Sequence, residues 1–165
     1  MPNWAFTYLT APKHVLDFMR NENAYPNEEK AEYRASDFDF NNIVPMPVEL
    51  DGTTAPSSSP NQEFINKYGT DNWYDWCSFN WGTKWNACRV DRRDDECGIY
   101  FETAWSPPIP VIEALSRKFP TDTLKIECTE ESDAFHVIRT YLNGMIIEEL
   151  NLEWTLNTSC PNCDD

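Results

Sequence analysis

Apolar and polar residues alternate in several short stretches of the chain, and each such stretch predicts a β-strand. Residues 4–8 alternate Trp, Phe and Tyr with Ala and Thr, which predicts a first strand. Pro12 suits the first turn of a helix whose short apolar stripe continues to Met19. Alternating Asp and Phe residues then predict a brief strand within 37–45. The beginning of the chain therefore favours a strand, a helix and a strand.

The middle of the chain has fewer regular patterns. A short second helix is expected around Glu28–Tyr33. Proline, serine and threonine dominate residues 45–60, and this composition predicts an exposed loop. Helical spacing resumes at Asn61–Tyr68 and stops at Gly69, a residue type that often ends helices.

The second half of the chain shows clearer patterns. Residues 87–90 and 98–103 favour two strands that are joined by an acidic turn over 91–96. Ser106 is a suitable N-cap for a helix that Pro120 ends.

A further strand and a hairpin complete the pattern. Residues 124–129 alternate apolar and polar side chains, as a half-buried strand does. The pair Asn143-Gly144 stands between two strand-like segments, 135–142 and 145–154, and such a pair is typical of a β-hairpin. Apolar and acidic or amide residues alternate at the end of the last strand, so one face is expected to be dry and the other acidic.

This order of elements predicts an α+β fold, an antiparallel sheet with helices packed on one face. The pattern is compatible with a ferredoxin-like core plus a C-terminal β-hairpin, where the term describes topology and implies no iron–sulfur cluster. We expect a single domain over residues 1–156 that contains the Pro/Ser-rich loop at 45–60. A mobile, Cys-containing tail is expected at 157–165.

The composition adds that the chain is strongly acidic. It has 28 Asp and Glu residues against 13 Lys and Arg residues, a formal net charge of −15. Such a surface repels nucleic acid, because binding requires Lys and Arg to neutralise phosphates. The concentrated basic pair Arg92-Arg93 is itself flanked by acidic residues. Direct DNA or RNA binding is therefore disfavoured, and the charge serves either solubility or the docking of a basic partner protein.

Two features bear on location. No apolar run approaches the roughly 18 residues that span a bilayer, and the N-terminus lacks the basic and apolar regions of a signal peptide. We therefore expect a cytoplasmic protein with no membrane partner. The six cysteines need not pair in a reducing compartment, and Cys128 on its predicted strand is expected to be a small buried hydrophobe.

Four of the seven tryptophans lie within residues 73–85. Clustered tryptophans either fill a core that has few aliphatic residues or line a recognition surface. As a surface, they would form an aromatic wall for a nucleotide or a cation. The candidate ligand-binding residues are Trp81, Lys84, Trp85, Glu102 and Trp105. In the alternative interpretation the indoles belong to the core, and Lys84 and Glu102 form an ordinary ion pair.

Four short segments of the sequence resemble a known family. They are Asn80-Trp-Gly-Thr-Lys-Trp85, Phe101-Glu-Thr-Ala-Trp-Ser-Pro-Pro-Ile-Pro110, Met1-Pro-Asn-Trp4 and Asn42-Ile-Val-Pro-Met-Pro47. On these segments, residues 1–130 resemble the YubB-type proteins of bacteriophages and plasmids, which have a ferredoxin-like domain. The resemblance implies a ferredoxin-like α+β fold and a mobile-element origin, but no activity. The pair Ala5-Phe6 departs from the family pattern, and the hairpin and Cys-rich tail after residue 130 are expected to be peculiar to this chain.

The motifs of common enzyme chemistries are incomplete. Cys160-Pro-Asn-Cys163 has zinc-ligand spacing, but a structural zinc site needs four ligands, so a flexible reduced tail is favoured. His14 and His136 lie in no nucleophile motif, and the five glycines form no phosphate-binding loop. We expect no cofactor, no metal beyond the weak candidates Cys160 and Cys163, and no enzymatic activity.

Two functional hypotheses follow. The first is a non-enzymatic acidic protein from a phage or mobile element that inhibits a host defence nuclease, of CRISPR or restriction type, by occupying its nucleic-acid-binding surface. Its candidate partner-binding residues are Glu127, Glu130, Glu131, Asp133, Glu148, Glu149 and Glu153. The second is a small-ligand or nucleotide-binding protein that uses the aromatic cleft. An exposed edge strand near 134–142 would also support a homodimer.

Overall fold

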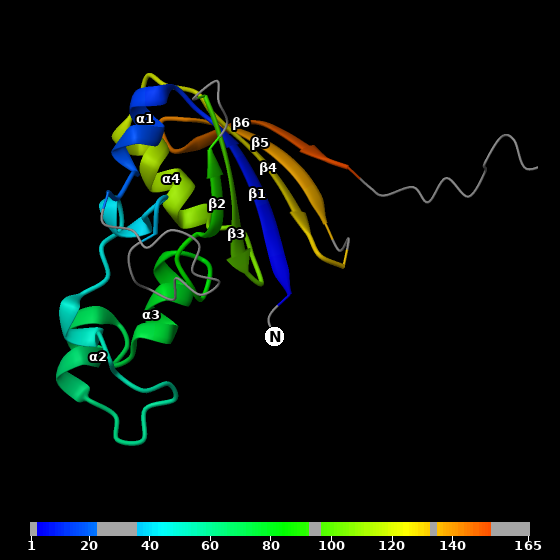
Figure 1. Cartoon of the computed structure of the whole chain (residues 1–165). Coiled ribbons are helices and arrows are strands. Elements are labelled where there is room, and N and C mark those ends of the chain that lie inside the picture. The colour runs from blue at the N-terminus through cyan, green and yellow to red at the C-terminus, as the bar shows by residue number, and fades with distance from the viewer. Residues whose placement is uncertain (1–2, 23–35, 93–96, 133–134, 153–165) are drawn as a thin grey trace, which may run out of the picture.

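The computed structural model describes residues 3–22, 36–92, 97–132 and 135–152. One antiparallel sheet runs through the molecule with the strand order β2-β3-β1-β4-β5-β6. Its strands are β1 (Trp4–Thr10), β2 (Cys88–Arg92), β3 (Gly98–Ala104), β4 (Leu124–Glu130), β5 (His136–Leu142) and β6 (Met145–Asn151). Helices α1 (Lys13–Phe18) and α4 (Ile109–Lys118) lie on one face of this sheet (Figure 1). The predicted α+β fold is confirmed.

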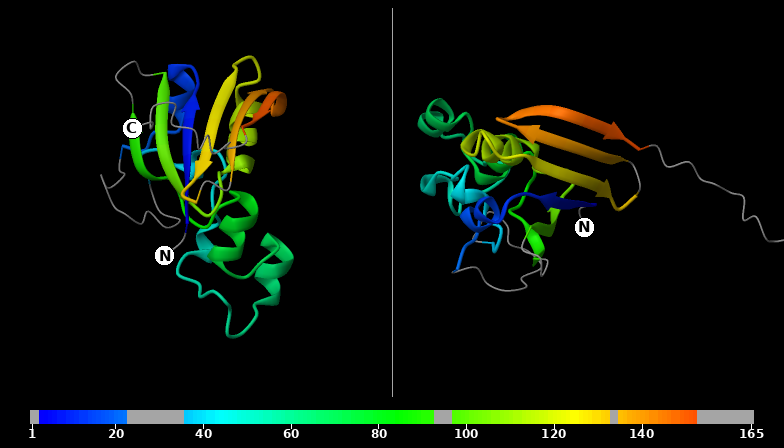
Figure 2. Two further views of the ribbon diagram at one scale, coloured as in Figure 1. Left: turned by 90° about the vertical axis from the view of Figure 1, so that its right-hand side faces the viewer. Right: turned by 90° about the horizontal axis from the view of Figure 1, so that it is seen from above.

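Strands β2, β3, β1 and β4 form a ferredoxin-like core, because α1 follows β1 and α4 connects β3 to β4. The β5–β6 hairpin extends the sheet beyond β4. A long connection between α1 and β2 carries two 3₁₀-helices, η1 (Phe40–Asn42) and η2 (Val48–Leu50), followed by α2 (Gln62–Tyr68) and α3 (Trp73–Asn80). The two views of Figure 2, together with Figure 1, place α2 and α3 together at one end of the molecule.

The two faces of the central strand β1 differ. Ala5, Thr7 and Leu9 are fully buried, and Leu9 belongs to the core beneath the helices. The aromatic residues that alternate with them in 4–8 lie on the other face and are half-buried. The first predicted strand is therefore confirmed, and its small residues face the helices because other rings fill the space there.

Those other rings come from the long connection. Phe38 stacks on Phe101 of β3 with ring centroids 4.9 Å apart, and Phe40 meets Trp81 edge-to-face at 5.6 Å. All four rings are fully buried. The Trp81 indole N–H donates to the carbonyl oxygen of Val44 at 2.8 Å, which satisfies its polar atom in the core.

The strand predicted within 37–45 is wrong. Phe38 makes an isolated bridge, and the next residues form η1. The Asp39 carboxylate accepts a bond from a backbone N–H of this turn, and Asn86 Oδ1 accepts from another at 3.0 Å. Such side-chain bonds offer the backbone an alternative to a strand ladder. Alternation within the segment does not reveal a partner that lies 46 residues away.

Asparagine caps begin both helices of the long connection. Asn61 Oδ1 accepts from two backbone N–H groups of the first turn of α2, and Gly69 ends this helix at φ 81°. Asn72 caps α3 by accepting from the N–H of Asp75. The predicted helix over 61–68 is confirmed, whereas α3 was not predicted because its aromatic residues show no one-sided apolar stripe.

Helix α4 begins at Ile109, later than the predicted N-cap Ser106. The Ser106 hydroxyl donates to the carbonyl oxygen of Gly82, and Pro108 takes the N-cap position. This hydrogen bond links the loop before α4 to residue 82, so Ser106 does not cap the helix. The helix ends at Lys118, shortly before Pro120, as predicted.

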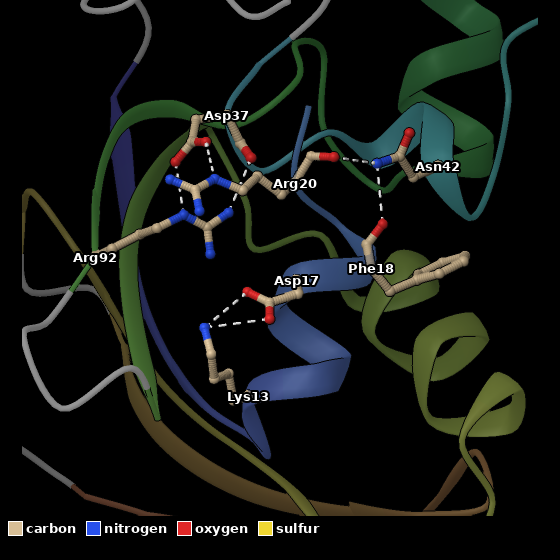
Figure 3. A network of polar contacts seen from close by, with 7 residues as sticks. All are labelled: Lys13, Asp17, Phe18, Arg20, Asp37, Asn42 and Arg92. Atoms are coloured by element: carbon tan, nitrogen blue, oxygen red, sulfur yellow. Dashed lines mark hydrogen bonds and ion pairs between the residues drawn. The ribbon is translucent and has the colours of Figure 1, made fainter. Parts of the chain in front are cut away.

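An ion-pair network ties the end of α1 to β2 (Figure 3). Asp37 binds Arg92 Nε at 2.8 Å and Arg20 Nε at 3.7 Å. Asn42 Nδ2 donates to two carbonyl oxygens at and just beyond the end of α1. Arg92 is therefore already paired with a carboxylate of the chain, which weakens the Arg92-Arg93 pair as a candidate phosphate contact.

Candidate functional site

Strand β6 lies at one end of the sheet, and all seven of its residues are exposed. Apolar side chains are prominent on it, since Met145 is 67%, Ile147 55% and Leu150 50% exposed. The strand pairs with β5 on one side, and no described strand pairs with its other side. A strand edge of this kind, lined with apolar side chains, is the arrangement by which sheets accept an additional strand.

The edge strand predicted near 134–142 is in fact internal. Strand β5 pairs with β4 on one side and with β6 on the other. Asn143 and Gly144 have positive φ angles, 50° and 75°, and reverse the chain as a tight hairpin requires. The Asn-Gly hairpin is thus confirmed, and it moves the exposed edge to 145–151.

A β-bulge decides which way the two glutamates of β6 face. The pairing of β5 with β6 shifts next to Thr140, and Ile147 is left as an extra residue. Beyond the bulge, Glu148 pairs with Thr140 and Glu149 pairs with Arg139. Consecutive strand residues point to opposite faces, so these two carboxylates lie on either side of the same edge.

The bulge also separates residues that the sequence placed together. Glu127 pairs with Ile138, which pairs with Leu150, so these three share the face opposite the helices. Glu149 lies on the other face, with Ile126 of the core. The prediction of one acidic face that contains both Glu127 and Glu149 is therefore wrong, because one extra residue inverts the alternation.

Glu149 is held in place at the edge by two neighbours. Its Oε2 lies 2.5 Å from Arg139 Nε, and its Oε1 accepts from Asn151 Nδ2 at 3.1 Å. The Asn151 amide and the Arg139 guanidinium hold the pKa of Glu149 below its usual range. Glu148 accepts a 3.3 Å bond from the Thr140 hydroxyl. Glu149 consequently stays ionised at neutral pH while it remains exposed.

Glu130, another predicted partner-binding residue, is buried. Its Oε1 accepts from Asn3 Nδ2 at 2.7 Å, and its Oε2 accepts from the backbone N–H of Ser132 at 3.0 Å. These bonds fasten the chain at the ends of β1 and β4. Glu130 therefore stabilises the fold and offers no exposed carboxylate.

The remaining predicted acidic residues do not form one group. Glu127 is exposed and contacts His136 Nε2 at 2.8 Å. Glu131 is exposed after the end of β4 and accepts from the N–H of Trp4 at 3.2 Å. Asp133 and Glu153 lie outside the described residues. Among those described, Glu148 and Glu149 are the two that share a strand with exposed apolar side chains.

The predicted wall of three indoles does not form. Trp81 is fully buried, Trp85 is 7% exposed and Trp105 is 45% exposed. Trp81 packs edge-to-face against Trp76, with centroids 5.8 Å apart, inside the core. The core interpretation is therefore correct for Trp81, which is not accessible to a ligand.

Lys84 lies among the rings that remain. Its Nζ is 4.6 Å from the ring centroid of Trp85 and 5.5 Å from those of Tyr74 and Trp105. These are cation–π distances. The cation that such a wall attracts is thus supplied by the chain itself.

Glu102, the other polar residue of the predicted cleft, pairs with a different cation. It is buried, its Oε2 lies 2.7 Å from Arg89 Nη1, and its Oε1 accepts from the Tyr100 hydroxyl at 2.9 Å. The burial of Tyr100 and its bond to Glu102 raise the pKa of this phenol. The expected ion pair between Lys84 and Glu102 is wrong.

Three of the four cysteines in the described part of the chain are buried, namely Cys77, Cys88 and Cys128. Burial raises the pKa of Cys128 to about 11 and also raises that of Cys77. Cys128 is fully buried, as predicted. Within the described residues, no three His, Cys, Asp or Glu side chains group as metal ligands. Cys160 and Cys163 lie outside them. None of the described helices is long and apolar enough to cross a membrane.

The chain is similar to known proteins both in its sequence and in its fold. The model of the family described as the ferredoxin-like domain in Api92-like protein matches residues 72–159, more than half of the chain. The chain belongs to this family. No curated protein matches it.

One solved structure resembles this Api92-like chain over most of its length. It is the crystal structure of the protein api92 from Yersinia pseudotuberculosis, with a TM-score of 0.56 and 11% sequence identity. The similarity covers 93% of this chain and 99% of that one. At this identity the likeness shows a shared fold.

The Api92-like match corrects one expectation. The hairpin after residue 130 was expected to be peculiar to this chain, but the family model extends to residue 159 and includes β5 and β6. The expected ferredoxin-like domain is confirmed. The matched family is the Api92-like one, and the YubB-type origin is not part of this match.

Proposed function

We propose that this Api92-like protein is a non-enzymatic interaction protein that binds an extended, basic segment of a partner protein along β6. The observation that carries the proposal is the exposure of every residue of β6 at the end of the sheet. An added strand would form main-chain hydrogen bonds with this edge and would cover its apolar side chains.

The two glutamates support a basic segment as the ligand. Neighbouring strands lie about 4.8 Å apart, so the side chains of an added strand would come close to Glu148 on one face and Glu149 on the other. Lys or Arg residues at neighbouring positions of the segment would then meet a carboxylate on each face. The net charge of −15 would increase the rate of encounter with such a partner.

The same glutamates disfavour a second copy of this chain as the occupant. If β6 paired antiparallel with itself about its centre, Glu148 would lie opposite Glu148 of the partner. Like charges directly opposite each other destabilise a strand pair. A heterologous basic partner is therefore favoured over the homodimer.

A host nucleic-acid-binding protein is the partner class that this chemistry favours. Such proteins carry Lys and Arg along the surfaces that neutralise phosphates. An acidic protein that occupies that surface would inhibit a host defence nuclease in the cytoplasm.

The direct test uses a synthetic strand as the probe. A fluorescent peptide with a central pair of adjacent Lys residues flanked by Val is titrated with the full chain, and its anisotropy is compared with that of the matched peptide with Glu in place of Lys and of the N-methylated form of the Lys/Val peptide. We expect the unmodified basic peptide to bind most tightly, because the other two lack charge complementarity or main-chain donors.

A matched pair of variants locates the site. Glu148→Lys is expected to weaken binding of the basic peptide by about tenfold, within the range of interfacial charge pairs. Glu63→Lys on α2 makes the same charge change away from β6 and serves as the control. Equal losses in both variants, or equal binding of all three peptides, would contradict the proposal.

A further inference from the structure

A pocket of about 320 Å³ lies between the end of α2 and α3. These two helices lie apart from the β5–β6 hairpin (Figures 1 and 2). It is lined by Tyr68, Gly69, Thr70, Asp75, Trp76, Phe79 and Asn80. Gly69 adopts the left-handed conformation that ends α2, so the chain turns sharply and brings the end of α2 against one side of α3. This volume suits a ligand the size of a side chain or a small metabolite.

Three aromatic residues and one carboxylate make up the chemistry of the pocket. Tyr68 comes from the end of α2, whereas Trp76 and Phe79 are three residues apart on α3 and therefore neighbours on the helix surface. Asp75 stands one turn before Phe79 on the same helix and is exposed. Aromatic faces with a nearby carboxylate are the combination that recognises organic cations.

The Phe79 side chain does not belong to the buried core. Its side chain is 86% exposed, although the neighbouring Trp76 is 7% exposed and packs on Trp81. The pocket thus combines a buried indole that packs on the core with an exposed phenyl ring. An exposed phenylalanine beside a pocket is more informative than a scattered surface residue.

Tyr68 is held in place by its neighbours. Lys67 Nζ lies 4.8 Å from the centroid of the Tyr68 ring and 3.1 Å from Glu49 Oε1. This contact fixes the tyrosine before any ligand arrives, which lowers the entropic cost of binding.

The rings around Lys84 provide an internal comparison. There, Tyr74, Trp85 and Trp105 surround an ammonium group of the chain itself. In the α2–α3 pocket, none of the seven lining residues is Lys or Arg. Among the lining rings, Tyr68 is contacted by Lys67, which is itself paired with Glu49, so a cation that also contacts Trp76 and Phe79 must come from outside the pocket lining.

We propose that the α2–α3 pocket binds an organic cation, an ammonium or guanidinium group, between Tyr68, Trp76 and Phe79 with Asp75 as its counter-ion. The cation belongs either to a small molecule or to a Lys or Arg side chain of another protein. This site is separate from β6, so it does not depend on the proposed function.

The test measures choline, its uncharged carbon isostere 3,3-dimethylbutan-1-ol, and N-acetyl-arginine amide against the full chain. Binding is followed by the shift of the indole N–H resonances in ¹H–¹⁵N spectra. We expect a saturable shift with a cation and a much weaker one with the isostere. Tighter binding of choline would assign the site to a small molecule, and tighter binding of the arginine derivative would assign it to a protein side chain.

The variants are made at exposed residues, and Asp75→Asn keeps an amide oxygen that can accept the 2.9 Å bond from Asn72 Nδ2. Phe79→Ala is expected to weaken cation binding about two- to thirtyfold, which corresponds to the range of cation–π energies. Asp75→Asn is expected to weaken it as well. Val48→Ala, at a residue that is 82% exposed outside the pocket, should leave it unchanged. Binding of the isostere as tightly as choline, no binding of either cation, or unchanged affinity in Phe79→Ala would overturn the proposal.

Discussion

At the scale of single residues, Gly98 shows how closely β3 and β1 approach on the face opposite the helices. A Cβ atom at position 98 would lie 1.9 Å from the hydroxyl oxygen of Tyr8 and 2.7 Å from its Cζ. The Tyr8 ring therefore occupies the space that a side chain at position 98 would need. This requirement follows from the pairing of two strands that are far apart in the sequence, so neither residue reveals it alone.

Gly98→Ala is expected to lower the free energy of unfolding by about 1–3 kcal/mol, because overpacking forces Tyr8 from its position. Urea denaturation measures the effect. In the double variant with Tyr8→Ala the alanine finds free space, so the two changes should cost less together than the sum of their separate costs. Strict additivity would contradict this explanation.

At the scale of elements, alternation in the sequence predicted the strands whose partners are regular. The strand at 4–8, the one at 124–129 and the Asn-Gly hairpin all belong to this group. Patterns failed where a distant side chain or an extra residue decides the backbone. Asn86 turns residues 40–42 into η1, and the extra Ile147 inverts the faces of β6. Neither effect is local, so periodicity does not detect it.

Glu49 joins η2 to α2, and its titration gives an element-scale prediction. The Tyr68 hydroxyl, its own backbone N–H and Lys67 lower the pKa of Glu49 from 4.5 to about 2. A carboxyl whose pKa is lower in the folded protein stabilises it above the unfolded pKa, and this contribution disappears as the pH falls through the folded value. The stability due to Glu49 should therefore be lost between about pH 4.5 and pH 2.

Glu49→Gln is the corresponding variant. It should be less stable than the natural chain at neutral pH, and the difference should vanish as the pH approaches 2. Unfolding by urea over a series of pH values measures both quantities, with Glu63→Gln on α2 as the control. A difference that stays constant through this range would show that the charge of Glu49 is not responsible.

At the scale of the whole molecule, the sequence predicted the chemistry of the candidate edge better than its location. Glu148 and Glu149 were chosen as acidic residues, but the exposed apolar strand was placed one strand too early. The run Met145-Ile146-Ile147 was the available signal, since three consecutive apolar residues in a terminal strand imply exposure of at least one. The α2–α3 pocket could not be predicted from the sequence, because Tyr68 and Phe79 belong to different helices and only the fold brings them together.

The natural chain is expected to be a monomer at neutral pH and low salt, because Glu148 and Glu149 oppose pairing of β6 with itself. Sedimentation equilibrium measures this directly. The double variant Glu148→Gln, Glu149→Gln removes the repulsion and should shift the equilibrium toward a dimer. A natural chain that is already dimeric through β6 would replace the heterologous partner with a second copy.

Arg139 would meet a carboxylate in either of two alignments of β6. With Ile147 bulged, its partner is Glu149; with Ile147 drawn into the ladder, Glu148 would take the same place. Leu150 distinguishes the two, because it lies beside Ile138 in the first and would lie beside Val137 in the second. A ligand that prefers one position of Leu150 would shift the population between the alignments. In that case the consecutive glutamates would let one hairpin present two recognition patterns without losing its ion pair.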